Sequence, residues 1–137
     1  MVPTGRDGDR RIDGIRLRSA RAGDARLLWN WANDPEVRRA SFHQARISWQ
    51  EHAEWYRNRL RDPDTRIYLA TDATGSPLGV VRFQGTGIPG CAAVSLSIAG
   101  QARGQGLGSR VLRLAARKAR REAGIATFIA HVKRENE

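Results

Sequence analysis

A glycine-rich turn at Arg103–Gly108 (RGQGLG) is the segment of this 137-residue chain whose residue types most directly suggest chemistry. Glycine adopts positive φ angles and has no Cβ, so a ligand can approach the backbone closely. Consecutive N–H groups at the start of a helix converge on an anion, and the helix dipole adds to the attraction. The sequence therefore predicts a phosphate or pyrophosphate site here. A strand-to-helix turn without a ligand is the alternative.

Two common phosphate-binding motifs do not match this turn. The P-loop needs a Gly-Lys-Ser/Thr ending, and Gly108-Ser109-Arg110 has no lysine. The dinucleotide fingerprint GxGxxG differs from the GxGxG spacing found here, and no suitable acidic residue lies about twenty positions on. If the turn binds a phosphate, the ligand therefore belongs to a different class.

The elements that would position the turn are read from the periodicity of apolar residues. Residues 1–13 lack periodicity and are expected to form a flexible basic tail, which leaves one domain over residues 14–137. Pro35 ends the first helix, Ser48 and Glu51 have capping-box spacing for the second, and Gly124 is placed to cap the third. We expect strands over 15–18, 67–71, 78–83, 91–98 and 126–132, helices over 22–32, 48–62 and 107–123, and irregular structure over 36–47. This order is α+β with a mixed sheet.

Composition narrows the classes of function. The net charge is +10, and all but Lys118 and Lys133 of the 24 basic residues are arginine. Because the basic residues are scattered and no reading motif accompanies them, they favour a phosphate-bearing ligand over nucleic acid. No apolar run approaches the ~20 residues of a membrane span, and the polar N-terminus shows no secretory signal. Cys91 is the only cysteine, and no Cys/His cluster predicts a metal site. We expect a cytoplasmic protein.

The turn, its position and the element order together resemble the GNAT superfamily of N-acetyltransferases. The family signature Gln/Arg-x-x-Gly-x-Gly/Ala is matched by Arg103, Gly106 and Gly108, and the resemblance covers residues 14–137. It implies the GNAT fold, a mixed, mostly antiparallel β-sheet flanked by helices, here without the usual C-terminal helix and two strands. The fifth strand would then expose an edge, and we expect a homodimer to cover it.

The resemblance implies acetyl-CoA as the acetyl donor. Backbone amides of residues 105–109 would hold its pyrophosphate, and Arg103 and Gly104 would line the approach. The fourth strand would pair with the pantetheine arm in a slot left by the splayed fifth strand, and Arg110 could reach the ribose 3′-phosphate. The implied donor-binding residues are Leu96, Ser97, Ile98, Arg103, Gly104, Gln105, Gly106, Leu107, Gly108, Ser109 and Asn136.

Acetyl transfer needs a base for the acceptor amine and an acid for the thiolate. The family often places a glutamate base on the fourth strand, but residues 93–97 (AVSLS) contain no carboxylate, and the usual tyrosine acid lies beyond residue 137. The remaining candidates are His52, Ser95 and Ser97. The serines could orient water. His52 could act as a base, bind a phosphate or pack in the core, and we favour the packed role; His43, in a predicted loop, has no stronger support.

The N-terminal half carries the signal for the acceptor. Trp31–Arg38, Ile47-Ser48, His52 with Trp55, and Leu78–Val80 resemble amino-sugar N-acetyltransferases that act on nucleotide-linked sugars in pseudaminic-acid-type pathways. This resemblance implies a primary amine on a nucleotide-linked amino sugar. The alternatives are a CoA-binding module or fragment without complete catalytic machinery, and an acetyltransferase of ribosomal-protein N-termini. We expect the tryptophans in the core, with Trp49 the best candidate for a ligand contact.

Overall fold

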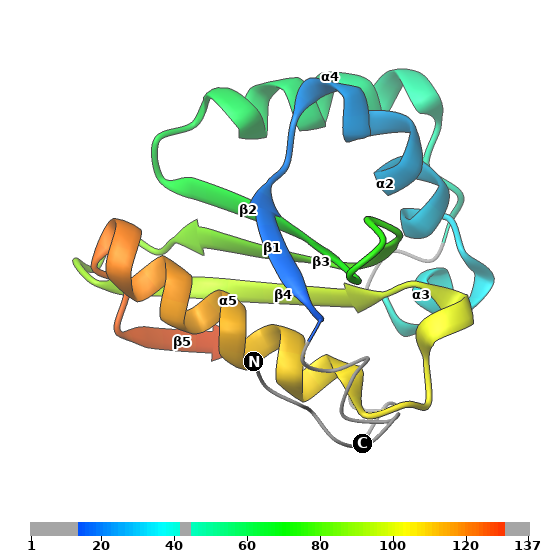
Figure 1. The fold of residues 1–137 in the computed structure, drawn as a ribbon. Helices are drawn as coiled ribbons and strands as arrows, with labels where there is room; N and C mark the ends of the chain where they lie inside the picture. The colour runs from blue at the N-terminus through cyan, green and yellow to red at the C-terminus, as the bar shows by residue number, and fades with distance from the viewer. Residues whose placement is uncertain (1–13, 42–44, 131–137) are drawn as a thin grey trace.

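The computed structural model describes residues 14–41 and 45–130. Its five strands form one sheet in chain order; the first three pairings are antiparallel and the last, β4 with β5, is parallel. Figure 1 shows α5 against one face of this sheet and α2 and α4 together on the other. The elements are β1 Arg16–Ser19, η1 Ala22–Asp24, α2 Ala25–Ala32, α3 Pro35–Ala40, α4 Trp49–Arg61, β2 Thr65–Thr71, β3 Pro77–Gly85, β4 Cys91–Ile98, η2 Gly100–Ala102, α5 Leu107–Ala123 and β5 Thr127–Ala130. The predicted mixed, mostly antiparallel sheet is confirmed.

The short helix α3 lies where the sequence predicted irregular structure, and that prediction was wrong. The Asp34 carboxylate caps α3 by accepting a hydrogen bond from the Glu36 N–H at 2.9 Å. Pro35 occupies the first helical position, where its missing N–H removes no helical hydrogen bond. The proline that ends α2 therefore also begins α3.

The first predicted helix is divided, since residues 22–24 form the 3-10 helix η1 and α2 begins at Ala25, and the boundaries of the other two predicted helices are confirmed. Ser48 accepts a hydrogen bond from the Glu51 N–H at 3.1 Å and donates one to the Glu51 carboxylate at 3.0 Å, which begins α4. Gly124 ends α5 in the left-handed region with φ 68°. The predicted hairpin strands are each longer than expected, since β2 begins at Thr65 and β3 runs from Pro77 to Gly85.

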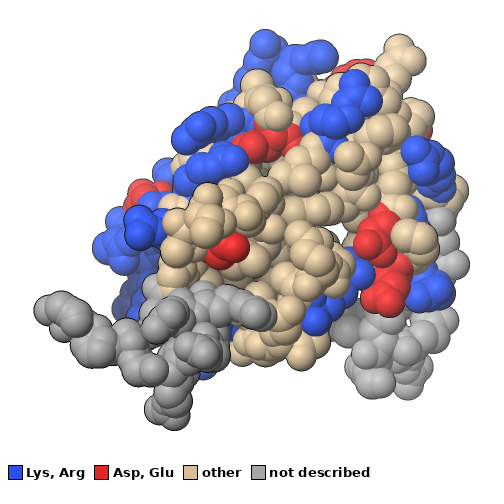
Figure 2. Space-filling model, turned by 45° about the vertical axis from the view of Figure 1, so that its right-hand side comes forward, with Lys and Arg blue, Asp and Glu red and all other residues tan. Residues whose placement is uncertain are grey.

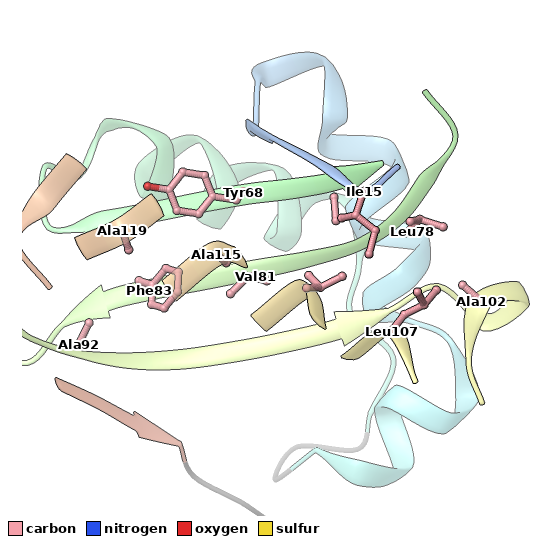
Figure 3. Packing of buried hydrophobic residues seen from close by; sticks show 12 residues of the cluster. Ile15, Tyr68, Leu78, Val81, Phe83, Ala92, Ala102, Leu107, Ala115 and Ala119 are labelled. Atoms are coloured by element: carbon pink, nitrogen blue, oxygen red, sulfur yellow. The ribbon is translucent and has the colours of Figure 1, made fainter. Parts of the chain in front are cut away.

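One face of the sheet packs against α5 in a continuous core (Figure 3). Strand alternation directs Tyr68, Val81 and Phe83 to this face, where each is at most 1% exposed. α5 packs against this face through residues about one turn apart, so that a single stripe of the helix is buried. The buried residues of α5 are Leu107, Val111, Ala115 and Ala119.

The opposite face has a smaller core, formed by Leu28, Tyr56, Ile67 and Leu69. Two contacts fasten its helices to the sheet. Arg18 on β1 donates two hydrogen bonds to the Asp24 carboxylate, both at 2.8 Å, and the Tyr56 hydroxyl donates to the Arg21 carbonyl at 2.6 Å. These contacts hold α2 and α4 at the sheet margin without filling the space between them.

Charge is distributed over several parts of the surface. On the side drawn in Figure 2, Lys and Arg lie at several separate places, with Asp and Glu among them. The outward face of α5 carries four exposed arginines: Arg113, Arg117, Arg120 and Arg121. Within residues 14–41 and 45–130, no helix combines the length and apolar character needed to cross a membrane.

Candidate functional site

The glycine turn leads into α5 as the sequence predicted. Gly104 and Gly106 have φ angles of 78° and 71°, a region that favours glycine. Gly106 is the N-cap residue of α5; it supplies no side-chain cap, and the first helical turn contains no acidic residue. The first N–H groups of a helix have no partner within the helix itself. A Cβ built at Gly104 or Gly106 would meet no atom within 4 Å, so this backbone faces open space. The arrangement can bind an anion.

Gly108 brings the start of α5 against the end of β4. A Cβ at Gly108 would lie 3.6 Å from Leu96 Cδ2 and 3.9 Å from Ile98 Cγ1, which are ordinary contact distances. A methyl group would therefore fit at Gly108 in contact with β4. The glycine turn and the last residues of β4 are therefore adjacent.

The outer edge of β4 is the second part of this site. The Ala99 N–H donates to the Leu78 carbonyl at 2.8 Å, so the antiparallel alternation directs the main chain of Ser97 toward β3 as well. The main-chain groups of Leu96 and Ile98 point to the opposite edge. In the described chain β5 pairs with β4 only as far as Val94. A ligand lying along this edge can bond to the main chain of Leu96 and Ile98, whereas Ser97 offers its side chain.

A groove of about 810 Å³ follows this edge of β4 and continues past α3. Arg103 joins the two sides of the groove: its Nε donates to the Ile98 carbonyl at 3.0 Å, and its guanidinium lies 3.4 Å from the Asp34 carboxylate and 3.3 Å from that of Glu36. These partners occupy the guanidinium, so Arg103 braces the end of β4 against α3. The Glu36 and Asp34 side chains thereby place α3 beside the groove.

A second cavity, of about 550 Å³, lies between the sheet and helices α2, α3 and α4. The residues lining it are Leu28, Trp31, Ala32, Val37, Arg38, Ser41, Ile47, Glu51, His52, Trp55, Tyr56, Ile67, Val80, Arg82, Ser95 and Ser97. Five of these also line the groove: Val37, Ser41, Arg82, Ser95 and Ser97. The two spaces therefore meet at the end of β4, where a group held in one can reach a group held in the other.

His52 is buried in the wall of the second cavity and is only 5% exposed. Its ring stacks on Tyr56, with centroids 5.9 Å apart and planes 9° apart. Burial lowers the pKa of the imidazole, and a backbone hydrogen bond with Ala25 partly opposes that effect. His52 Nε2 has no hydrogen-bond partner among the described residues. This burial agrees with the expected packed role, and a chemical role would need a bound ligand in contact with Nε2.

Arg82 was not identified from the sequence and stands where the two spaces meet. Its guanidinium lies 5.0 Å from the centroid of the Trp55 ring. It forms no ion pair or hydrogen bond with any residue that the structure describes, and burial followed by repulsion from Arg59 lowers its pKa. The available signal was a single charge within the apolar strand segment 78–83, since a charge half-buried in a strand usually has a partner.

The positions of the tryptophans differ from the expectation that they pack in the core. Trp49 packs edge-on against Trp29, with ring centroids 5.6 Å apart, and Arg26 covers it at 4.1 Å. The cavity is lined by Trp31 and Trp55 and not by Trp49, whose expected ligand contact stays a prediction. The amphipathic pattern of a helix such as α4 predicts which side chains face the protein interior. It does not predict whether such a side chain packs in the core or borders a cavity.

The segment between α3 and α4 is held by polar contacts with α2. The Ile47 carbonyl accepts hydrogen bonds from Trp29 Nε1 and Asn33 Nδ2, both at 2.9 Å. The Ile47 N–H in turn donates to Asn33 Oδ1 at 2.8 Å. These bonds place Ile47 at the cavity wall. Trp29 and Asn33 are four residues apart, so both side chains reach the same carbonyl.

The remaining predicted site residues are accounted for as follows. Ser95 and Ser97 line both spaces, and Gln105, Leu107 and Ser109 belong to the turn and the first helical turn of α5. His43 and Asn136 lie outside the described residues. Within residues 14–41 and 45–130, no group of three His, Cys, Asp or Glu side chains is placed to hold a metal ion.

Comparison with known proteins gives the following relationships. A family model described as an acetyltransferase (GNAT) domain matches residues 15–137. A sequence search of curated proteins found no significant match. Among solved structures, the chain is similar to spermidine N-acetyltransferase from Vibrio cholerae in complex with CoA and spermine, with TM-score 0.81, 23% identity, and coverage of 90% of this chain and 74% of that one. It is also similar to a dodecameric structure of that enzyme in an intermediate state, with TM-score 0.73, 24% identity, and coverage of 90% and 72%. At these identities the likeness shows a shared fold.

Proposed function

Because the chain belongs to the GNAT acetyltransferase family, we propose that it transfers acetyl from acetyl-CoA to the primary amine of a small acceptor that also carries an anionic group, best represented by a nucleotide-linked amino sugar. Its activity as an N-acetyltransferase with acetyl-CoA as donor follows from the family. The acceptor class, and the roles of individual residues, are the proposal.

The donor is assigned to the groove along β4. When bound, acetyl-CoA supplies a thioester whose carbonyl an amine can attack. The N–H groups of residues 105–109 would hold its pyrophosphate, since this turn lacks a side-chain cap and an acidic residue. The main chain of Leu96 and Ile98 would align the pantetheine arm as an added strand. Leu96 is 36% exposed, which suits an apolar contact with that arm.

The acceptor class rests on one observation, the uncompensated guanidinium of Arg82 where the two spaces meet. A half-buried charge without a partner is unfavourable, and an anionic ligand would relieve that cost through charge-assisted hydrogen bonds. Arg38 adds a second positive charge to the described cavity lining, while Glu51 is the one acidic residue in it. A polyamine would meet net repulsion there. A phosphate-bearing acceptor would meet attraction.

The aromatic residues of the cavity support the same class of acceptor. Trp31 and Trp55 line the wall, and Trp55 is 39% exposed. Indole rings stack on nucleobases and on sugar faces without needing a specific hydrogen-bond pattern. A nucleotide-linked amino sugar could place its base against an indole, its phosphates near Arg82 and its amine toward β4.

The test measures thiol release from acetyl-CoA with UDP-glucosamine, spermidine and a peptide with a ribosomal-protein N-terminus as acceptors. We expect the highest kcat/KM with UDP-glucosamine. Arg82→Met should lower that value about 10- to 100-fold, the range of a charge-assisted hydrogen bond. The same variant should not lower kcat/KM with spermidine. Arg66→Met is the matched control, because Arg66 lies on β2 and pairs with Glu122 on the α5 side. A preference for spermidine that Arg82→Met leaves unchanged would refute the proposed acceptor.

A CoA-binding module without turnover is the second candidate, because residues 93–97 of β4 supply no carboxylate. It predicts saturable calorimetric binding of acetyl-CoA and no thiol release with any of the three amines. Turnover with any amine removes it.

A homodimer through β5 and a cytoplasmic location also stay predictions. Phe128 and Ile129 on β5 are 37% and 40% exposed, and a second copy could cover them. Light scattering at micromolar concentration should then report twice the mass of one chain. A monomer with full activity would contradict this assembly.

A further inference from the structure

We infer that His52 is the general base of the acetyl transfer, and that its Nε2, which exposes less than 1 Å² to solvent in this structure, takes the proton from the bound acceptor amine. The inference rests on the proposed function in one respect: the amine must enter the 550 Å³ cavity that His52 lines. It does not depend on which amine enters.

The geometry of His52 differs from that of an ordinary packed histidine. Buried polar atoms nearly always have a hydrogen-bond partner, yet Nε2 has none in the described chain although His52 is only 5% exposed. The Ala25 backbone raises the pKa of the ring, and we assign this contact to Nδ1 because Nε2 has no partner among the described residues. A proton held on Nδ1 leaves the lone pair of the neutral ring on Nε2. This lone pair is the acceptor that a base requires.

The neighbours of His52 fix the ring without competing for the proton. Tyr56 stacks on it, while Trp49 and Trp55 flank it with centroids 6.2 and 5.9 Å away. The Tyr56 hydroxyl is already used as a donor to the Arg21 carbonyl, and burial raises the pKa of Tyr56 to about 12. Tyr56 therefore positions the imidazole and does not act as a base near neutral pH.

Burial keeps the imidazole neutral, and three charged groups line the same cavity in the described chain. Helix α4 contributes Glu51, helix α3 contributes Arg38 and strand β3 contributes Arg82, while α2, β2 and β4 contribute only uncharged residues to its lining. The Glu51 carboxylate accepts a hydrogen bond from the Ser48 hydroxyl at the start of α4. Burial opposes protonation of His52, so the free-base form prevails at pH 7.

The proton balance of the reaction is complete with this base. The acceptor enters as an ammonium group and loses two protons on its way to the amide. The first goes to Nε2 of His52, which frees the nitrogen lone pair to form the N–C bond. The C–S bond breaks as the thiolate leaves, the second proton goes to the departing sulfur, and the proton on Nε2 is released to solvent.

The first experiment needs no turnover. In ¹⁵N-labelled protein, the imidazole resonances that disappear in His52→Asn should report a neutral ring protonated at Nδ1, with a pKa below the usual 6.5. Adding desulfo-CoA and UDP-glucosamine together should shift Nε2. A ring protonated at Nε2, or one with a pKa above 6.5, would overturn the inference.

The second experiment is the pH dependence of kcat/KM in three variants. Asn places its amide near Nδ1 and Gln places its amide near Nε2, so His52→Asn preserves the bond to Ala25 and removes only the base. His52→Asn and His52→Gln should each lose about 100-fold or more and lose the acidic limb of the profile, with acetyl-CoA affinity unchanged. Glu51→Gln keeps the capping box and should retain the acidic limb, although the loss of a charge from the cavity lining changes the rate.

The outcomes separate this inference from the proposed acceptor. If the wild type does not acetylate UDP-glucosamine but acetylates spermidine, the proposed acceptor class is refuted. The pH profiles of the three variants are then measured with spermidine. Retention of the acidic limb in His52→Asn shows a packing role and sinks the inference. Loss of that limb in Glu51→Gln instead would assign the base to Glu51.

Discussion

The two faces of the sheet are built differently. On the α5 face, twelve buried residues form one continuous cluster that joins all of the first four strands to α5. On the α2 and α4 face, four buried residues form the cluster, and beside it is a cavity of about 550 Å³. A large continuous core stabilises the fold, and the hollow on the other face gives a ligand space to bind.

This difference assigns separate tasks to the faces. The start of α5 carries the glycine turn, so the face that holds most of the core also fixes the proposed donor site. The residues that would recognise the acceptor, including Arg82 and Trp55, lie on the other face. Substitutions there can change the acceptor with little effect on the core, because few buried contacts depend on them.

The largest expected effect tests the stability side of this comparison. Phe83 is completely buried against α5, and Phe83→Ala should lower the free energy of unfolding by about 3–5 kcal/mol. Val80, three residues away on β3, borders the cavity, and Val80→Ala should cost about 1 kcal/mol. Urea denaturation of both variants measures the two losses. Equal losses would show that the cavity face is packed as tightly as the α5 face.

The next effect concerns the donor turn. Gly106→Val puts a branched side chain at φ 71° and covers amides that face open space, so acetyl-CoA affinity should fall about 100-fold or more. Isothermal titration measures this loss. Gly75→Val is the matched control, because Gly75 has φ 90° and equally open surroundings in the β2–β3 turn. If both variants bind acetyl-CoA alike, the turn at Gly104–Gly108 does not hold the donor.

A smaller effect should appear on the acceptor face. Trp55→Ala removes an indole from the cavity wall and the ring beneath Arg82, whose guanidinium lies 5.0 Å from its centroid. We expect KM for UDP-glucosamine to rise about 5- to 10-fold, the size of a cation–π contact, with acetyl-CoA affinity unchanged. Trp49→Ala, outside the described cavity lining, is the comparison. A larger rise in KM for Trp49→Ala would place the acceptor elsewhere.

The sequence predicted the α5 face better than the cavity face. The stripe from Leu107 to Ala119, the capping glycine and the turn are local patterns, and local patterns are visible in a single sequence. The cavity depends on how far α2 and α4 stand from the sheet, which is set by long-range contacts such as Tyr56 with Arg21. Arg82 and the free Nε2 of His52 acquire their meaning only from that spacing.

The missed helix α3 has a local cause. Asp34-Pro35 was interpreted as the end of α2, although Asp before Pro is also a frequent way to begin a helix. The consequence reached the site, because α3 supplies Glu36 to Arg103 and Val37 and Ser41 follow the boundary between the groove and the cavity.

The smallest expected effect comes from the pair that fastens α2 to β1. Hydrogen bonds from Arg18, followed by one from the Arg21 backbone, hold the pKa of Asp24 below its usual value against the opposing effect of burial. A carboxyl whose pKa is lowered by folding stabilises the protein above its unfolded pKa, about 3.9, and that stabilisation is lost as the pH falls through the folded value. Asp24→Asn should therefore cost about 1 kcal/mol at pH 7, since Arg18 is a third exposed, and the difference from wild type should shrink below about pH 4. Thermal unfolding from pH 7 to pH 2.5 measures it, with Glu122→Gln on the α5 face as the comparison. Because Asp24 belongs to the cavity face, Asp24→Asn should also weaken binding of the acceptor more than binding of acetyl-CoA. An equal loss of the two affinities would mean that the two faces do not act separately.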